Sequence, residues 1–384
     1  MVQLKRVVII VFLFLFVSLI FSFWLFLQSP IVLESSSLNE WPMFHRDLTH
    51  SGYSNSAAPL TPDIMWKFDG GHVIWASPAV VDGHIFIASD DTQVYCLDAL
   101  TGEQVWRYRT KNALGSSAAV AGGYVYVGSY DRNIYCLDAA TGAKIWSFAT
   151  GDVVQSSPAI FNGYVYVGSW DGNLYCLNAE TGIKLWNYST GGLIESSPAI
   201  SDGKVYFGSI DSNVYCLDAL SGEKIWRYTT GNVIQSSASI YGDYLYIGSE
   251  DNNVYCLNAT SGKKIWSYLT QGWVDSSPAI ANGYVYVGSW DGDNNVYCLD
   301  ALTGSKIWNY TAKEGVNSSP AIANGYVYVG SWDGILYCLD ALSGEKMWSY
   351  TTGSHINSSP AVARGVVYVG SWDHNVYAFG NPAD

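Results

Sequence analysis

Residues 156–188 read SSPAIFNGYVYVGSWDGNLYCLNAETGIKLWNY, which divides into four short runs of Val, Ile, Leu, Tyr and Trp separated by Asn-Gly, Asp-Gly and Thr-Gly. Runs of this composition bounded by such dipeptides are typical of β-strands joined by tight turns. The same phrase of about forty residues returns along the chain after residue 63. Four strands in a repeat of this length predict β-propeller blades, because a lone four-stranded sheet must pack on a neighbour to bury its faces.

Two repeat positions fix the number of blades at eight. The Trp of the fourth strand occurs eight times, at Trp66, Trp106, Trp146, Trp186, Trp226, Trp266, Trp308 and Trp348. The Tyr of the third strand also occurs eight times, at Tyr95, Tyr135, Tyr175, Tyr215, Tyr255, Tyr297, Tyr337 and Tyr377. Trp66 precedes every other strand, and no Trp strand follows Tyr377. We therefore predict that residues 64–68 complete the last blade and close the ring without an exposed sheet edge.

Composition agrees with one all-β domain of four-stranded antiparallel blades, residues 64–380. Helical periodicity is absent after residue 63, and 29 Tyr with 16 Trp supply flat side chains for packing between sheets. The net charge is −14 and no basic patch is visible, so no nucleic-acid partner is expected.

The N-terminus contains a long apolar segment. Residues 7–27 carry no charged side chain and are long enough to cross a bilayer of about 30 Å as a helix. Lys5 and Arg6 precede them, so residues 1–6 are expected in the cytoplasm and the propeller on the extracytoplasmic side of the cell membrane. A cleaved signal peptide is the alternative, but its apolar region would be shorter and would end in small residues, unlike Phe26-Leu27-Gln28. We predict a single-pass signal-anchor.

Residues 28–63 are predicted to join the membrane helix to the propeller as a tether and a leader segment. The leader includes Trp41-Pro42-Met43-Phe44 and His50-Ser51-Gly52, which are not repeat sequence and are too aromatic for a free linker. We expect the leader to lie across the propeller.

Seven cysteines share one repeat position, where the eighth copy has Ala378. Equivalent positions on neighbouring blades should exceed the ~7 Å between Cα atoms that a disulfide tolerates. We therefore predict free, buried packing residues at Cys96, Cys136, Cys176, Cys216, Cys256, Cys298 and Cys338.

The segment from Cys136 through Asp138, Thr141 and Gly142 to Trp146 resembles the tryptophan-docking repeat of the pyrroloquinoline quinone (PQQ)-like β-propellers. That family includes quinoprotein dehydrogenases and BamB-like proteins, and the match recurs between residues 64 and 379. In the family the position of Cys136 is usually Ala. The leader also looks like the segment before the first blade of BamB-like members. The resemblance implies that the eight fourth-strand Trp residues dock on the Thr-Gly turn of an adjoining motif and are structural.

The resemblance leaves a PQQ-dependent dehydrogenase as one alternative. Dehydrogenases of this fold resemble one another in a vicinal Cys pair, long insertions with calcium ligands and a catalytic Asp, and often a haem-attachment Cys-x-x-Cys-His. All cysteines here are isolated and nearly all connections are short. We therefore predict no catalytic residues and no bound cofactor, PQQ included.

Two other patterns favour structural roles, so no metal site is predicted. The six His residues are scattered without a metal-ligand spacing. The hairpin at residues 291–295, DGDNN, resembles part of a calcium loop but lacks the later acidic ligand of an EF-hand, so a longer turn is preferred. The repeated Asp at positions 131, 171, 211 and 251 is predicted to cap its own turn.

Comparison of the blades with one another separates scaffold positions from free ones. The loops before the first strand and between the second and third strands vary strongly, and strand alternation places both sets on one face of the disc. We expect this face to bind a partner through an axial ring of mainly polar side chains and an exposed arc of aromatic ones. The predicted binding residues are Trp75, Gln155, Glu195, Gln235, Asp275, Asn317 and Asn357 in the axial ring, and Tyr130, Trp170, Trp290, Trp332 and Trp372 in the arc.

The sequence thus predicts a membrane-anchored, extracytoplasmic, non-catalytic binding or scaffold module for a protein, peptide or glycan partner. A PQQ-dependent dehydrogenase-like enzyme and a structural cell-surface protein that stacks through its flat faces are the alternatives. BamB-like assembly work is less favoured, because no Cys lies near residue 27 to carry a lipid.

Overall fold

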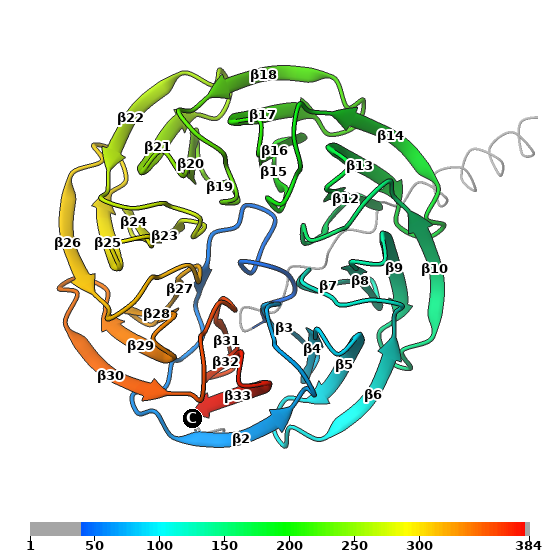
Figure 1. Ribbon diagram of the computed structural model, residues 1–384, viewed down its shortest axis with the longest axis horizontal. Coiled ribbons are helices and arrows are strands. Elements are labelled where there is room, and N and C mark those ends of the chain that lie inside the picture. The colour runs from blue at the N-terminus through cyan, green and yellow to red at the C-terminus, as the bar shows by residue number, and fades with distance from the viewer. Residues whose placement is uncertain (1–39, 381–384) are drawn as a thin grey trace, which may run out of the picture. The chain divides into compact units, whose positions relative to one another are not determined.

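The computed structural model describes residues 40–380, in which the chain forms 33 β-strands and no α-helix (Figure 1). The strands make eight sheets arranged as blades around a central axis. The prediction of an all-β, eight-bladed propeller with four-stranded blades is therefore confirmed. Residues 40–380 contain no helix that is long and apolar enough to span a bilayer. The predicted membrane helix, residues 7–27, lies outside the described range.

The first four blades each consist of four consecutive antiparallel strands, from a short inner strand to a longer outer one. Blade 1 is β3 (Ala79–Val81), β4 (His84–Ala88), β5 (Gln93–Asp98) and β6 (Gln104–Arg109). Blade 2 is β7 (Ala119–Ala121), β8 (Tyr124–Gly128), β9 (Asn133–Asp138) and β10 (Lys144–Ala149). Blade 3 is β11 (Ala159–Phe161), β12 (Tyr164–Gly168), β13 (Asn173–Asn178) and β14 (Lys184–Ser189). Blade 4 is β15 (Ala199–Ser201), β16 (Lys204–Ser209), β17 (Asn213–Asp218) and β18 (Lys224–Thr229).

The next three blades repeat this arrangement, and the last takes strands from both ends of the described chain. Blade 5 is β19 (Ser239–Tyr241), β20 (Tyr244–Gly248), β21 (Asn253–Asn258) and β22 (Lys264–Leu269). Blade 6 is β23 (Ala279–Ala281), β24 (Tyr284–Gly288), β25 (Asn295–Asp300) and β26 (Lys306–Thr311). Blade 7 is β27 (Ala321–Ala323), β28 (Tyr326–Gly330), β29 (Ile335–Asp340) and β30 (Lys346–Thr351). Blade 8 is β31 (Ala361–Ala363), β32 (Val366–Gly370), β33 (Asn375–Gly380) and β2 (Ile64–Asp69).

The ring is closed as predicted, by pairing of β2 with β33. The two strands are antiparallel, with Trp66 opposite Ala378 and Phe68 opposite Val376. Trp66 therefore takes the place in blade 8 that the fourth-strand Trp takes in the other blades. Figure 1 shows the blue β2 lying along the red β33 at the rim.

The apolar core lies between neighbouring blades, where the fourth-strand Trp covers the turn of the next blade in seven of the eight cases. For example, Trp226 Nε1 donates a 2.9 Å hydrogen bond to the Ala259 carbonyl oxygen. A Cβ atom placed on Gly262 would lie 2.6 Å from the Trp226 ring, so glycine allows the close contact. Trp186 differs from the others in one respect, since its ring covers Gly222 but its Nε1 has no hydrogen-bond partner in the described part of the chain.

Where blade 7 packs on blade 8, Pro59 supplies a hydrogen-bond acceptor that the repeat itself cannot provide. Trp348 Nε1 and the Tyr328 hydroxyl group both donate to the Pro59 carbonyl oxygen, each at 3.1 Å. Between blades 6 and 7, the equivalent donors are Trp308 Nε1 and the Tyr286 hydroxyl group, and both donate to the Ala341 carbonyl oxygen. Ala341 lies in the loop between the third and fourth strands of blade 7. In blade 8 these two strands, β33 and β2, are not consecutive in the chain. The residues just before β2 therefore replace the missing loop.

The leader runs through the centre of the ring (Figure 1). Its backbone carbonyl oxygens accept amide hydrogen bonds of 2.6–2.8 Å from the middle residue of six inner strands, and β1 (Tyr53–Ser54) pairs in parallel with β27. These contacts satisfy donors at inner strand edges that would otherwise be unpaired. The six donors are Val80, Val120, Ile200, Ile240, Ile280 and Ile322.

Two histidines of the leader are buried in the centre of the ring, His45 and His50. His45 Nδ1 lies 3.1 Å from the His50 carbonyl oxygen, and His50 Nδ1 lies 3.0 Å from the Ala238 carbonyl oxygen. Burial lowers the pKa of His45 to about 3 and that of His50 to about 4, so both rings are neutral near pH 7. Neutral rings let the leader lie inside the propeller without a buried positive charge.

An aspartate stabilises the hairpin between the second and third strands of each blade. Asp251 Oδ1 accepts the Asn253 N–H at 3.0 Å, and its Oδ2 accepts the Tyr255 hydroxyl at 2.6 Å. The turn-capping role predicted for this Asp position is therefore confirmed. In the longer hairpin of blade 6, Asp293 likewise accepts the hydroxyl group of Tyr297, and it also accepts the Gln271 N–H from the loop before the blade. Among residues 40–380 no group of three or more His, Cys, Asp or Glu side chains could hold a metal ion.

The cysteine prediction is also confirmed. All seven thiols are free and buried. Burial raises their pKa to about 12, so they stay protonated and poorly nucleophilic.

Candidate functional site

The two variable loop sets meet on one face of the propeller. Side-chain hydrogen bonds link the loop before a first strand to the hairpin between second and third strands. Trp75 Nε1 donates to Asp90 at 3.0 Å, and Trp290 Nε1 donates to Asp275 at 2.6 Å. Two further contacts of this kind are Tyr130 with Gln155 at 3.0 Å and Gln235 with Glu250 at 2.9 Å.

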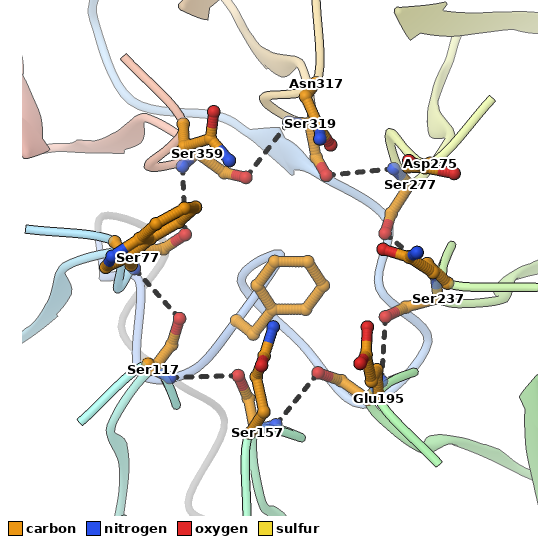
Figure 2. Close-up of a pocket in the computed structure, with 17 residues that line it drawn as sticks. Ser77, Ser117, Ser157, Glu195, Ser237, Asp275, Ser277, Asn317, Ser319 and Ser359 are labelled. Atoms are coloured by element: carbon orange, nitrogen blue, oxygen red, sulfur yellow. Dashed lines mark hydrogen bonds between the residues drawn. The ribbon is translucent and has the colours of Figure 1, made fainter. Parts of the chain in front are cut away.

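A closed ring of eight serines surrounds the axis below these loops (Figure 2). The backbone N–H of each serine donates to the hydroxyl oxygen of the serine in the next blade, at 2.8–3.0 Å. None of these hydroxyl groups donates a hydrogen bond to another described residue, so each keeps one free O–H donor. The serine ring consists of Ser77, Ser117, Ser157, Ser197, Ser237, Ser277, Ser319 and Ser359.

A cavity of about 220 Å³ lies on the axis of this face, and we call it the axial cavity. The serine ring and the predicted axial ring line it, and Phe44 of the leader adds one aromatic ring. The lining includes two carboxylates, Glu195 and Asp275, and no Lys, Arg or His side chain among the described residues. The cavity is therefore polar and acidic.

The aromatic arc is packed rather than exposed, which corrects the expectation from the sequence. The ring centroids of Trp75 and Trp372 are 4.4 Å apart, those of Trp372 and Trp332 6.0 Å, and those of Trp332 and Trp290 5.1 Å. Each of these side chains is half-buried, because its ring packs at a tilt against its neighbour in the next blade. Tyr130 and Trp170 form a separate pair at 6.1 Å.

Several polar atoms of this face are buried without a hydrogen-bond partner in residues 40–380. Three are indole N–H donors, and four are side-chain oxygen acceptors. Buried polar groups are usually paired, so each of these exceptions calls for an explanation, such as an ordered water or ion. The atoms are Nε1 of Trp170, Trp332 and Trp372, and Oδ1 of Asp90, Asn252, Asp275 and Asn357.

Burial perturbs the acids of this face. Desolvation raises the pKa of Asp275 to about 7, with smaller increases from Glu250 and Glu195 and an opposing effect of the Trp290 hydrogen bond. Desolvation and the Glu250 charge raise the pKa of Glu195 as well. Perturbed carboxyl groups in a cavity are typical of functional sites, although structural networks also produce them.

The structure brings together only part of the predicted site around the axial cavity. Seven of the twelve predicted binding residues line it: Trp75, Gln155, Glu195, Gln235, Asp275, Asn317 and Asn357. The other five, Tyr130, Trp170, Trp290, Trp332 and Trp372, lie in the surrounding hairpins and do not line it. The sequence analysis missed the serine ring and Phe44. The serines carried a signal, since the same position is Ser in all eight copies, whereas Phe44 lies outside the repeat.

One family profile, described as outer membrane protein assembly factor BamB, matches residues 55–152, 131–289, 211–312 and 292–381. The chain belongs to this BamB-like family of PQQ-repeat propellers. Among curated proteins there is no significant match to the sequence.

Solved structures of very different proteins share the fold of this family member. The chain is similar to a europium-containing methanol dehydrogenase, at 15% identity and TM-score 0.81, over 92% of this chain and 100% of that one. It is similar to BamB from Moraxella catarrhalis, at 19% identity and TM-score 0.73, over 84% of this chain and 98% of that one. It is also similar to the computationally designed protein Ika8, at 16% identity and TM-score 0.74, over 85% of this chain and 100% of that one. Likeness at this identity shows the fold alone and does not select a function.

Proposed function

We propose that this BamB-like propeller is a non-catalytic binding or scaffold module, and that the face around the axial cavity binds a protein, peptide or glycan partner. One observation carries the proposal. The differences between blades concentrate on this face, where they surround a polar cavity and several buried donors and acceptors without partners. Aromatic side chains around a polar cavity are the composition of a recognition surface.

The family match favours a protein or peptide among the possible partners. Its profile is described as an assembly factor, whose work is contact with other proteins. Half-buried Trp and Tyr side chains around polar groups are also frequent in protein interfaces. No Cys lies near residue 27 to carry a lipid, so the anchor that we propose is the apolar segment, residues 7–27, and not a lipid.

The proposal places the propeller outside the cytoplasm, anchored by residues 7–27. It rests on the uncharged segment with Lys5 and Arg6 before it. At residue 40 the chain is fixed to the face opposite the axial cavity. Glu40 Oε1 accepts hydrogen bonds from the Asp82 N–H at 3.1 Å and from Arg364 at 3.3 Å, in loops between first and second strands.

The proposed function includes no PQQ. That quinone carries three carboxylates, and carboxylates are held best by Arg and Lys. The described lining of the axial cavity offers instead the carboxyl groups of Glu195 and Asp275, which repel an anion. Purified protein mixed with PQQ and calcium should therefore acquire no bound quinone absorbance after desalting. Retained quinone with alcohol-dependent dye reduction would favour the dehydrogenase alternative.

The test of the binding face uses full-length protein and crosslinking capture of its partner. Replacing Trp332 and Trp372 by Ala should weaken capture, by about 1–4 kcal/mol in affinity for each residue that acts as an anchor. The control replaces Asn162 and Asn282, on the opposite face, by Gly, which tolerates their φ values of 50° and 52°. Capture that is lost in the control and kept in the Trp variant would show that the wrong face was chosen.

A further inference from the structure

The carboxyl groups of Glu195, Glu250 and Asp275 lie on one side of the axial cavity, which we call the acidic side. Glu195 and Asp275 line the cavity from the loops before blades 4 and 6, and Glu250 lies in the hairpin of blade 5 between them. Figure 2 shows Glu195 and Asp275 on the same side of the serine ring, with Ser237 between them. No cationic side chain of residues 40–380 lines the cavity to balance their charge.

Asp275 is the most enclosed of these acids. Its residue is 8% exposed, and Trp290 Nε1 donates to its Oδ2 at 2.6 Å. Its Oδ1 has no hydrogen-bond partner in the described chain. A buried carboxylate without a counter-charge is costly in free energy, and an opposite charge within hydrogen-bond distance removes much of that cost.

An aromatic wall stands across the cavity from the acidic side. Trp75 lines the cavity from the loop before blade 1, which is opposite blade 5 in a ring of eight. Its indole N–H is used by Asp90, and its ring packs 4.4 Å from that of Trp372. The face of an indole ring attracts cations, and this attraction increases where water is excluded.

We infer that the axial cavity binds an ammonium or guanidinium group between the acidic side and Trp75. The inference rests on the proposed function and makes the partner a basic one. The cation offsets the repulsion among Glu195, Glu250 and Asp275 through their charges, and the carboxyl group of Glu195, which lines the cavity, is the group that can accept its N–H. The serine ring, with its free O–H groups, offers donors to acceptor atoms next to the cation. The same cation is found on a Lys or Arg side chain of a peptide and on a free polyamine.

The experiment is calorimetric titration of full-length protein in detergent with three probes. These are the peptide Gly-Arg-Arg-Gly amide, spermidine and maltohexaose, with the Gly-Glu-Glu-Gly peptide as the matched anion. The arginine peptide should bind, and affinity should fall as salt is raised, because the interaction is electrostatic. The double variant Glu195→Gln, Asp275→Asn should lose about tenfold or more in affinity. The matched control, Asp202→Asn with Asp243→Asn on the opposite face, should bind as the wild type does.

The outcomes separate the possible ligands. Binding of spermidine alone assigns the cavity to free amines, and binding of the arginine peptide assigns it to basic side chains. The inference is overturned if maltohexaose or the glutamate peptide binds better, if no cationic probe binds, or if the double variant binds unchanged. Partner capture that depends on Trp332 and Trp372 but not on Glu195 and Asp275 would keep the proposed function and reject this inference.

Discussion

At the scale of one residue, Asp275 links the acidity of the cavity to the stability of the fold. Burial and its acidic neighbours Glu250 and Glu195 raise its pKa from 3.8 to about 7. Between these values the unfolded chain has lost the proton that the native state keeps, so the free energy of unfolding decreases as pH rises through this window. Asp275→Asn should remove the decrease, because the amide is neutral and its oxygen still accepts the Trp290 N–H.

Urea unfolding at pH 5 and pH 8 measures this effect. The variant should be more stable than the wild type at pH 8 by more than ~1 kcal/mol, since one pKa unit corresponds to ~1.4 kcal/mol. The difference should shrink at pH 5, where the native carboxyl is protonated. Asp202→Asn, exposed on the opposite face, serves as the control. An Asp275→Asn protein that is no more stable at pH 8 would contradict the ionisation argument.

At the scale of the element, the leader protects some inner strands and not others. Its carbonyl oxygens pair with six inner-strand amides, while Ile160 of β11 and Val362 of β31 have no such acceptor among the described residues. Amide hydrogen exchange requires loss of the hydrogen bond. The amides of Ile160 and Val362 should therefore exchange faster than those of Ile200 and Ile240, measured residue by residue. Equal protection of the inner-strand amides in all eight blades would mean that the leader hydrogen bonds do not determine which of these amides are protected from exchange.

The two parts of the segment before blade 1 should differ in their effect on folding. A chain that begins at residue 58 keeps Pro59, which accepts from Trp348 and Tyr328, and keeps β2. It should fold but melt below a chain that begins at residue 40, because it lacks the leader contacts. A chain that begins at residue 71 lacks the outer strand of blade 8 and should not fold. Identical thermal melting of the chains from 58 and 71 would show that β2 is not the closing strand.

At the scale of the whole molecule, the contacts between blades determine whether the ring holds. Gly262 and Gly242 belong to the same blade and have φ values of 68° and 57°, so Ala at either position suffers backbone strain of about 1–2 kcal/mol. Only at Gly262 would the added Cβ meet Trp226 of the preceding blade, at 2.6 Å. Gly262→Ala should therefore lower the melting temperature clearly more than Gly242→Ala. Equal effects would show that the Trp contact is not tightly packed.

The sequence predicted the parts of the molecule that are repeated and missed the parts that are not. Equal counts of Trp and Tyr were enough to predict the closing strand, because Trp66 could only belong to blade 8. The path of the leader depends on single contacts such as Trp41 with Val80, for which no periodicity exists. The serine ring was missed for the opposite reason. Its residues are identical in all eight copies, and a position that never varies does not stand out when the blades are compared for differences, although these serines line the cavity.

The route of the leader also has a mechanical consequence. A pulling force transmitted from the N-terminal side enters the described structure at Glu40 and first meets the Trp41–Val80 pair, then the carbonyls bound to the other inner strands. β2 comes later in the chain, so it bears no load while those contacts hold. Tension would therefore extract the leader before it could peel the closing strand from β33. A force applied at this end of the described chain is therefore carried by the leader contacts, and the ring stays closed until those contacts break.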